Sequence, residues 1–213
     1  MSVPKRKENK MNVDYLRLVP DPVSEEYVEP PFPLYPHQAE GIEYLRNNQK
    51  AFLTDEMGLG KTIQALMALP PATCALVICP ASLKGNWAKE VEAWRPDLTP
   101  VILKGRGNFR WPCLGEIVIV NYELLPSDFE SPRLNWKVNA IVDEAHYLKK
   151  YKAARTKNWR GLAKQIVRAG GSTWGMTGTP LVTNPMDLWG CLESFGLAQK
   201  AYGNFARFTR TWG

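Results

Sequence analysis

The chain has 213 residues, with 27 lysines and arginines against 21 aspartates and glutamates, so its formal charge at neutral pH is +6. A hydrophobic fraction of 45% is ordinary for a globular protein, and a domain of this length can bury a core without disulfides or a structural metal. No run of about 18 apolar residues could span a membrane, and the four cysteines lack a zinc-ligand spacing. We expect an intracellular, soluble monomer, with a cytoplasmic location favoured and a nuclear one left open, whose cysteines are reduced and mostly buried.

The first 33 residues contain little that could form a core. Residues 1–19 begin with several basic side chains and predict a disordered arm, for which a solvated tail is a simpler explanation than a nucleic-acid contact. Residues 20–33 are rich in proline, which has no backbone N–H to donate, so this stretch should form an extended lead-in rather than a helix or a central strand.

Downstream of this lead-in, short apolar runs alternate with helical patterns. A helix over residues 60–69 is apolar on nearly every side and should be buried, and a second helix places Leu83, Trp87, Val91 and Trp94 on one face. Unalternated strands separated by helices are typical of an α/β protein with a mostly parallel sheet covered on both faces, whose ligand lies beyond the carboxyl ends of the strands. The predicted strands are residues 51–54, 75–79, 101–103, 117–120, 138–142 and 172–176.

The first predicted strand runs directly into a glycine-containing turn and then a buried helix, which is the arrangement that a phosphate group needs. Gly58 and Gly60 would let successive N–H groups point at the β- and γ-phosphates of ATP, Lys61 would add a positive charge, and the Thr62 hydroxyl could bind Mg²⁺. A turn that only caps a helix would have no use for Lys61. The sequence therefore predicts a phosphate loop formed by Asp55, Glu56, Met57, Gly58, Leu59, Gly60, Lys61 and Thr62.

Two adjacent acids follow the fifth predicted strand. At the tip of a buried strand neighbouring the phosphate loop, Asp143 could reach the Mg²⁺ of a bound nucleotide, and Glu144 could orient and deprotonate the attacking water. The alternative is a solvated loop, but apolar residues lead directly into the pair. Asp143 and Glu144, with Lys61, are therefore the predicted catalytic residues, while His146 could couple the nucleotide state to motion or simply pack.

With these two motifs placed, the chain resembles the first RecA-like lobe of a helicase superfamily two protein, of the Swi/Snf-type DNA translocase branch. Residues 55–62 match the phosphate loop of that branch throughout, including Asp55, and residues 34–41 resemble its glutamine motif, in which Gln38 would read adenine. Residues 79–83, with Trp87 and Glu90, resemble the segment that carries the first contacts with the DNA backbone, and residues 118–125 resemble the next such segment. Residues 177–180 resemble the motif that links hydrolysis to lobe movement. The resemblance implies DNA contacts by Ser82, Lys84, Asn121 and Tyr122, and coupling through His146, Thr177, Gly178 and Thr179.

Residues 149–168 hold eight basic side chains and no acid. A helix here would pack an apolar face that includes Trp159 and Ile166 and leave a basic face in water, and a solvated face is as good an explanation for that helix as a nucleic-acid contact. For the basic residues just after the catalytic acids, Lys149, Lys150 and Lys152, contact with phosphates of the DNA backbone is the favoured interpretation.

The resemblance implies an ATP- and Mg²⁺-dependent ATPase that moves on double-stranded DNA, with similarity inside the branch to annealing-helicase-like members. Residues 34–195 would form the RecA-like ATP-binding lobe, and residues 196–213 would begin a connector toward a second RecA-like lobe in the full-length protein. The isolated lobe should bind nucleotide weakly and be nearly inactive. Two alternatives stay open: a natural single-lobe adaptor switched by nucleotide without motor activity, and an RNA helicase of the Asp-Glu-Ala-His type.

Overall fold

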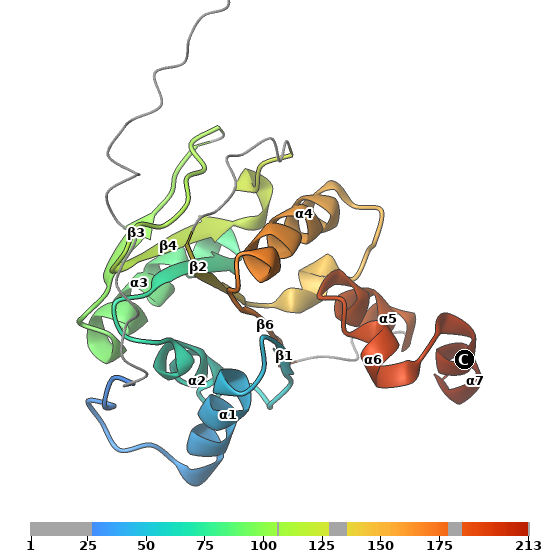
Figure 1. The fold of residues 1–213 in the computed structure, drawn as a ribbon, viewed down its shortest axis with the longest axis horizontal. Helices are drawn as coiled ribbons and strands as arrows, with labels where there is room; N and C mark the ends of the chain where they lie inside the picture. The colour runs from blue at the N-terminus through green and yellow to red at the C-terminus, as the bar shows by residue number, and fades with distance from the viewer. Residues whose placement is uncertain (1–26, 106, 128–135, 179–184, 213) are drawn as a thin grey trace, which may run out of the picture.

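The computed structural model describes residues 27–105, 107–127, 136–178 and 185–212. Six parallel strands form one sheet in the order β1-β6-β5-β2-β4-β3 (Figure 1). The α/β fold class and all six predicted strands are confirmed. The strands are β1 (Lys50–Leu53), β2 (Cys74–Cys79), β3 (Thr99–Ile102), β4 (Glu116–Asn121), β5 (Val138–Val142) and β6 (Thr173–Met176).

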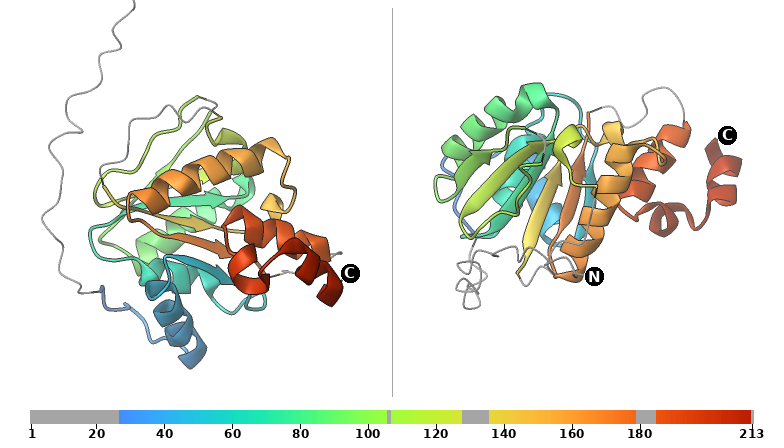
Figure 2. Two further views of the ribbon diagram at one scale, coloured as in Figure 1. Left: turned by 45° about the vertical axis from the view of Figure 1, so that its right-hand side comes forward. Right: turned by 90° about the horizontal axis from the view of Figure 1, so that it is seen from above.

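Helices cover both faces of the sheet, as Figure 2 shows from two directions. Helices α1 (Pro36–Arg46), α2 (Lys61–Ala68) and α3 (Lys84–Trp94) lie on one face, and α4 (Ala154–Arg168) lies on the other. The C-terminal part consists of α5 (Pro185–Ser194), α6 (Ala198–Tyr202) and α7 (Phe205–Trp212). Short 3₁₀ turns η2 (Ala81–Leu83), η3 (Tyr122–Leu124) and η4 (Ala145–Leu148) follow β2, β4 and β5. None of the helices in the described ranges is long and apolar enough to cross a membrane.

The buried strands explain why the sheet needs two helical layers. Successive side chains of a strand point to opposite faces, and the register places Val77 of β2 beside Ile119 of β4 and Ile141 of β5 in the core under α1, α2 and α3. The intervening Leu76 belongs to the other core, which α4 covers. Because both faces of each central strand are apolar, each must be covered by helices.

The C-terminal helices pack on one another through aromatic rings. The ring centroid of Trp189 on α5 lies 5.2 Å from those of Phe205 and Phe208 on α7, and Phe208 is fully buried. Gly190 of α5 lies so close to η4 that a Cβ there would stand 2.0 Å from the carbonyl oxygen of Lys149. The stretch expected to begin a connector, residues 196–213, thus contains two short helices held against α5, and its role as a connector stays a prediction.

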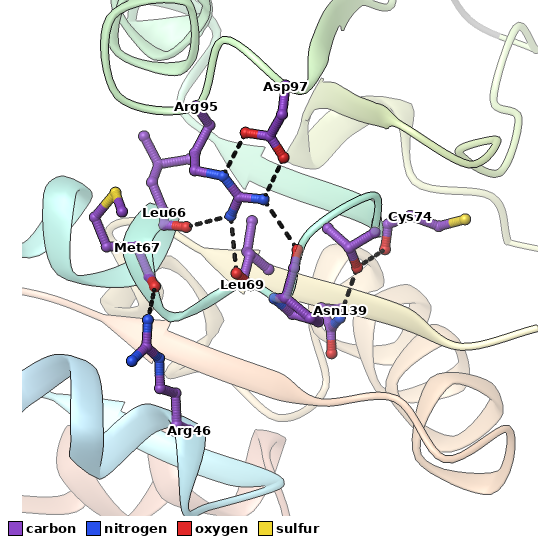
Figure 3. A network of polar contacts seen from close by, with 10 residues as sticks. Arg46, Leu66, Met67, Leu69, Cys74, Arg95, Asp97 and Asn139 are labelled. Atoms are coloured by element: carbon purple, nitrogen blue, oxygen red, sulfur yellow. Dashed lines mark hydrogen bonds and ion pairs between the residues drawn. The ribbon is translucent and has the colours of Figure 1, made fainter. Parts of the chain in front are cut away.

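The end of α2 is held by two arginines that the sequence analysis did not single out. Arg95, fully buried, donates to the carbonyl oxygens of Leu66 and Leu69 at 2.9 Å and forms a two-pronged ion pair with Asp97, at 2.8 and 2.7 Å (Figure 3). A third carbonyl, that of Pro70, accepts from the same guanidinium at 2.9 Å, and Arg46 Nη2 donates to Met67 O at 2.7 Å. The last carbonyls of a helix have no partner within it, so these contacts fix the helix that begins at the phosphate loop.

The four cysteines are free thiols, and Cys74, Cys79 and Cys191 are buried, as predicted. Burial raises the pKa of each of these three to about 12, so at pH 8 they hold roughly a thousandfold less thiolate than a thiol with a pKa near 9. We expect a Cys113→Ser variant, which keeps only the buried three, to react with a thiol reagent far more slowly when folded than in guanidinium. Rapid labelling of the folded variant would contradict their burial.

Candidate nucleotide and nucleic-acid site

The phosphate loop follows β1 at the carboxyl edge of the sheet and ends where α2 begins. Gly60 caps α2 with a φ of +75°, a left-handed conformation that disfavours side chains, and a Cβ there would stand 2.3 Å from Gln38 Nε2. Lys61 Nζ donates to the carbonyl oxygens of Asp55 and Glu56, both at 2.7 Å. The lysine therefore lies inside the loop, against the backbone that a phosphate would face, and Thr62 follows it on the first turn of α2.

A fully buried glutamine supports the loop from below. Gln64 Nε2 donates to Asp55 Oδ2 at 2.9 Å and to Leu59 O at 3.3 Å, which gives Asp55 a structural contact at the position where the general phosphate-loop pattern has glycine. Its Oε1 faces α1 so closely that a Cβ on Gly41 would stand 1.8 Å away. The close approach of α1 thus locks the side chain that holds the loop.

This contact predicts opposite effects of alanine at two helical glycines. In Gly41→Ala the methyl group would displace Gln64 and break its bonds to the loop, so we expect unfolding to become easier by about 1–3 kcal/mol. In Gly85→Ala on α3, where nothing lies within 4 Å of the added Cβ, we expect a gain of up to about 1 kcal/mol from helix propensity. Denaturant titration measures both, and equal effects would show that the tight contact has no energetic weight.

Gln38, predicted to read adenine, lies at the start of α1 and is 5% exposed. Its Oε1 accepts from Tyr35 N at 3.0 Å, and its Nε2 lies 3.5 Å from Leu59 O. His37 Nε2 lies 3.1 Å from the same carbonyl, and its ring stacks on that of Tyr35, which is 68% exposed. The glutamine motif is therefore joined to the phosphate loop through Leu59, while its contact with adenine stays a prediction.

Asp143 follows β5 and is held from two sides. Its Oδ2 accepts from Trp87 Nε1 and its Oδ1 from the backbone N–H of Glu144, both at 2.9 Å. Burial nevertheless raises the pKa of Asp143, although these bonds and the charge of Lys61 act to lower it. A half-buried carboxylate whose desolvation outweighs its hydrogen bonds suits a bound cation, which fits the predicted Mg²⁺ ligand.

Glu144 is held in a strained conformation beside a histidine. Its φ of +51° is uncommon for a residue with a side chain, and its Oε2 lies 3.1 Å from His146 Nδ1 without accepting a hydrogen bond from any described group. His146 Nδ1 also lies 3.2 Å from Thr177 Oγ1 at the end of β6. The structure thus brings Glu144, His146 and Thr177 together, with Gly178 packed against Met57 of the phosphate loop, while Thr179 lies outside the described residues.

The strand order corrects one expectation about this site. Asp143 was expected at the tip of a strand neighbouring that of the phosphate loop, but β6 lies between β1 and β5. Thr177, at the end of β6, is therefore placed between the loop and the acids. Hydrophobic patterns give strands but not the order in which they pair, which is why the sequence could not reveal this arrangement.

Tyr122 does not fit the predicted DNA contact. The residue is 1% exposed, and its hydroxyl donates to the carbonyl oxygen of Asp143 at 2.5 Å and lies 3.3 Å from that of Glu144. Desolvation by burial raises its pKa well above the ordinary value. Its side chain positions the backbone of the two acids and cannot reach a phosphate from there.

The other predicted DNA contacts divide into exposed and engaged groups. Ser82, Lys150 and Lys152 are exposed at the carboxyl edge. Lys84 Nζ donates to Asn121 Oδ1 and to Leu103 O, both at 2.9 Å, and Asn121, 8% exposed, donates onward to Glu123 at 2.6 Å.

Lys149 does not fit its predicted contact with DNA phosphates either. It pairs with Asp187 of α5 at 2.8 Å, with both side chains about three-quarters buried, so its charge is already neutralised inside the protein. The sequence placed it correctly after the acids but could not show that a carboxylate from α5 would meet it.

Three supporting residues were missed as site residues by the sequence analysis: Trp87, His37 and Gln64. The sequence predicts Trp87 as a core residue on a segment that resembles one with DNA-backbone contacts. It is 2% exposed, and its one polar atom donates to Asp143, 56 positions further along the sequence. A polar handle on a buried aromatic is a general feature of tryptophan, but its partner can only be found in three dimensions.

The family model described as SNF2-related domain matches residues 37–212, which is most of the chain. The chain belongs to the SNF2-related domain family. As an SNF2-family domain it carries the α/β arrangement of the SWI2/SNF2 ATPase core.

Individual relatives of this SNF2-family domain are much longer proteins. The chain is 30% identical over 191 residues to the human "DNA annealing helicase and endonuclease ZRANB3", covering 84% of this chain and 17% of that protein. It is 34% identical over 183 residues to the "ISWI chromatin-remodeling complex ATPase ISW1" of Saccharomyces cerevisiae, covering 75% and 15%. The solved Sulfolobus solfataricus SWI2/SNF2 ATPase core in complex with dsDNA shares the fold at a TM-score of 0.65 and 24% identity, over 87% of this chain and 40% of that one. The chain thus spans about one sixth of these two curated relatives.

Proposed function

We propose that this chain is the ATP-binding lobe of an SNF2-type, ATP- and Mg²⁺-dependent motor that acts on double-stranded DNA. The observation that carries the proposal is the convergence of three motifs at one edge of the sheet: the loop with Lys61, the acids Asp143 and Glu144, and Thr177 between them. A purely structural domain would have no use for this set. The names of the relatives, a helicase and a remodelling ATPase, support the same assignment.

In this proposal each residue of the site has a separate task. Lys61 moves from the carbonyls of Asp55 and Glu56 to the phosphates, whose charge attracts it more strongly than neutral carbonyls do. Thr62 and Asp143 would hold Mg²⁺, which when bound with ATP offsets the charge of the phosphates and polarises the terminal one. Glu144 orients the attacking water and takes its proton at the carboxylate.

The proposal also assigns the parts that surround this site. His146, between Glu144 and Thr177, would report the state of the nucleotide to β6 and the segment after it. The backbone of the duplex would be contacted by Ser82, Lys150 and Lys152. It would also be contacted by Lys84 together with its hydrogen-bond partner Asn121. A second RecA-like lobe, in cis in the full-length protein, would complete the nucleotide site and supply an arginine to it.

The test measures ATP hydrolysis by the chain and by the longest form of the protein its source produces, with and without nucleic acid. We expect duplex DNA to stimulate hydrolysis at least tenfold in a two-lobe form, and the single lobe to bind MgATP with little turnover. Preferential stimulation by RNA would favour the RNA-helicase alternative. A native protein of one lobe that binds ATP and never turns it over would favour the nucleotide-switched adaptor.

A further inference from the structure

The outer side of α4 is more basic than a solvated helix needs to be. Its sequence from Ala154 to Arg168 contains no acid, and Lys157, Arg160, Lys164 and Arg168 recur at three- and four-residue spacing. At about 100° per residue, these four positions fall within an arc of about 80°, on the side opposite the buried Trp159, Leu162 and Ile166. We call these four cations the α4 stripe.

The α4 stripe has no ion-pair partner in the part of the chain that the structure describes. Arg160 stacks instead on Tyr151, with its guanidinium 4.1 Å from the ring centroid, which fixes its direction. Like charges four residues apart, such as Arg160 with Lys164 and Lys164 with Arg168, destabilise a helix by a few tenths of a kcal/mol per pair. The first turn of α4 also lacks an acid, which would interact favourably with the positive end of the helix dipole. Arg168, in the last turn, is favourably placed for the helix dipole, but the repeated like charges along the helix favour a negatively charged partner beside it.

The stripe also borders a hollow that gathers further charge. A cavity of about 260 Å³ lies between α4, the start of β1 and the end of α5, and its lining includes Lys50, Arg160, Lys164 and Arg168, with Glu193 as the acid among the lining residues. Lys50 comes from a different element, so cations from two parts of the chain converge on one place. Lys50 and Thr173 begin their strands, which puts this hollow at the amino edge of the sheet, away from the nucleotide site.

The shape of the stripe indicates the kind of partner. From Lys157 to Arg168 the helix rises about 17 Å, at 1.5 Å per residue, and duplex DNA presents about five phosphates of one strand over that length. A row of separate cations matches a linear polyanion better than a single phosphate group. α4 also begins a few residues after the exposed Lys150 and Lys152, and it lies over one face of the sheet (Figures 1 and 2).

We propose that the α4 stripe, with Lys50, is a second contact for the backbone of double-stranded nucleic acid, extending the duplex interface from the carboxyl edge to the amino edge of the sheet. This inference rests on the proposed function in taking duplex DNA as the partner. It adds a surface that lies outside the nucleotide site and outside the contacts expected near Ser82. Because phosphate contacts are independent of base sequence, the stripe would strengthen binding without adding sequence preference.

The test compares two triple variants of the chain with the same change in charge. Lys157→Gln, Lys164→Gln and Arg168→Gln remove exposed stripe cations, while Lys89→Gln, Lys200→Gln and Arg207→Gln remove exposed cations on α3, α6 and α7. Binding of a labelled 40-base-pair duplex is measured between 50 and 200 mM salt. Since each neutralised phosphate contributes about 0.9 to the salt slope, the stripe variant should lose about 2.7 from the slope and the control little. Thermal melting checks that both variants fold.

Each other outcome has a definite meaning. Equal slopes in the two variants would overturn the stripe and leave the proposed function standing. A slope that falls only in the stripe variant, in a protein that never hydrolyses ATP, would keep the stripe and contradict the motor. Poly-glutamate is also tested as a competitor of the labelled duplex. If it competes as well as unlabelled DNA of equal charge, and if only the stripe variant loses this competition, the stripe binds an acidic protein segment and the DNA assignment is overturned.

Discussion

Glu144→Gln is expected to lower ATP hydrolysis at least a hundredfold while leaving MgATP binding within a few-fold of the unmodified chain. An amide has the shape of the carboxylate but cannot take a proton, and general-base catalysis contributes about 10²–10⁴ to a rate. Single-turnover hydrolysis measures the chemical step even when overall activity is low, and fluorescence titration with a labelled ATP measures binding. Glu92→Gln, the same change at an exposed position on α3, is the control.

A second variant separates the loop from the acids. Lys61→Ala removes the lysine that lies inside the phosphate loop, so we expect it to weaken ATP binding about a hundredfold, in contrast to Glu144→Gln. Both variants should therefore hydrolyse slowly, but only Glu144→Gln should retain nucleotide. Unchanged hydrolysis in both would overturn the site assignment, and loss of binding in Glu144→Gln would mean that the glutamate holds the nucleotide or the loop.

Arg95→Ala should be among the most destabilising single changes in this protein, at about 3–5 kcal/mol. It leaves the carbonyls of Leu66, Leu69 and Pro70 without their partner and empties the space of a fully buried side chain, while Asp97, which is exposed, loses its counter-ion. For a chain of this size the midpoint of thermal unfolding should fall by about 10 °C. Arg46→Ala, which frees one such carbonyl, that of Met67, should cost about 1 kcal/mol.

Arg95→Ala should also change how the stability of the protein depends on acidic pH. Burial alone would raise the pKa of Asp97, but the hydrogen bonds and charge of Arg95 outweigh it and hold the pKa below the ordinary value. A carboxyl with a lowered folded-state pKa stabilises the protein above its unfolded pKa of about 4, and this contribution is lost as the pH falls through the folded value. Between pH 6 and pH 3 the free energy of unfolding should therefore fall less steeply in Arg95→Ala than in the unmodified chain. Parallel curves would show that the ion pair contributes little to the acid sensitivity.

Local patterns predicted the strands, the phosphate loop and the acids, because each is written in consecutive residues. The order β1-β6-β5 depends on pairing between distant strands, and the contact of Trp87 with Asp143 depends on how α3 crosses the sheet. Neither leaves a mark in the sequence. Tyr122 and Lys149 show a third limit, because a motif gives a residue its place along the chain but not the direction of its side chain, and one points into the core while the other points to Asp187.

The absence of a side chain at Gly190 brings α5 into direct backbone contact with the residues that follow η4, so a movement of one would be transmitted to the other. The backbone of α5 there lies directly against the carbonyl of Lys149, in the turn that follows Glu144 and His146, and Lys149 is tied to Asp187 one helical turn earlier. Among the described residues, backbone meets backbone at this point, and the Lys149–Asp187 ion pair and the contact of Cys191 Sγ with the carbonyl oxygen of Ala145 lie beside it. A shift of this turn would therefore move α5 as a rigid body. It would also move α7, which packs on Trp189 of α5, and α6, which lies between the two helices in the chain.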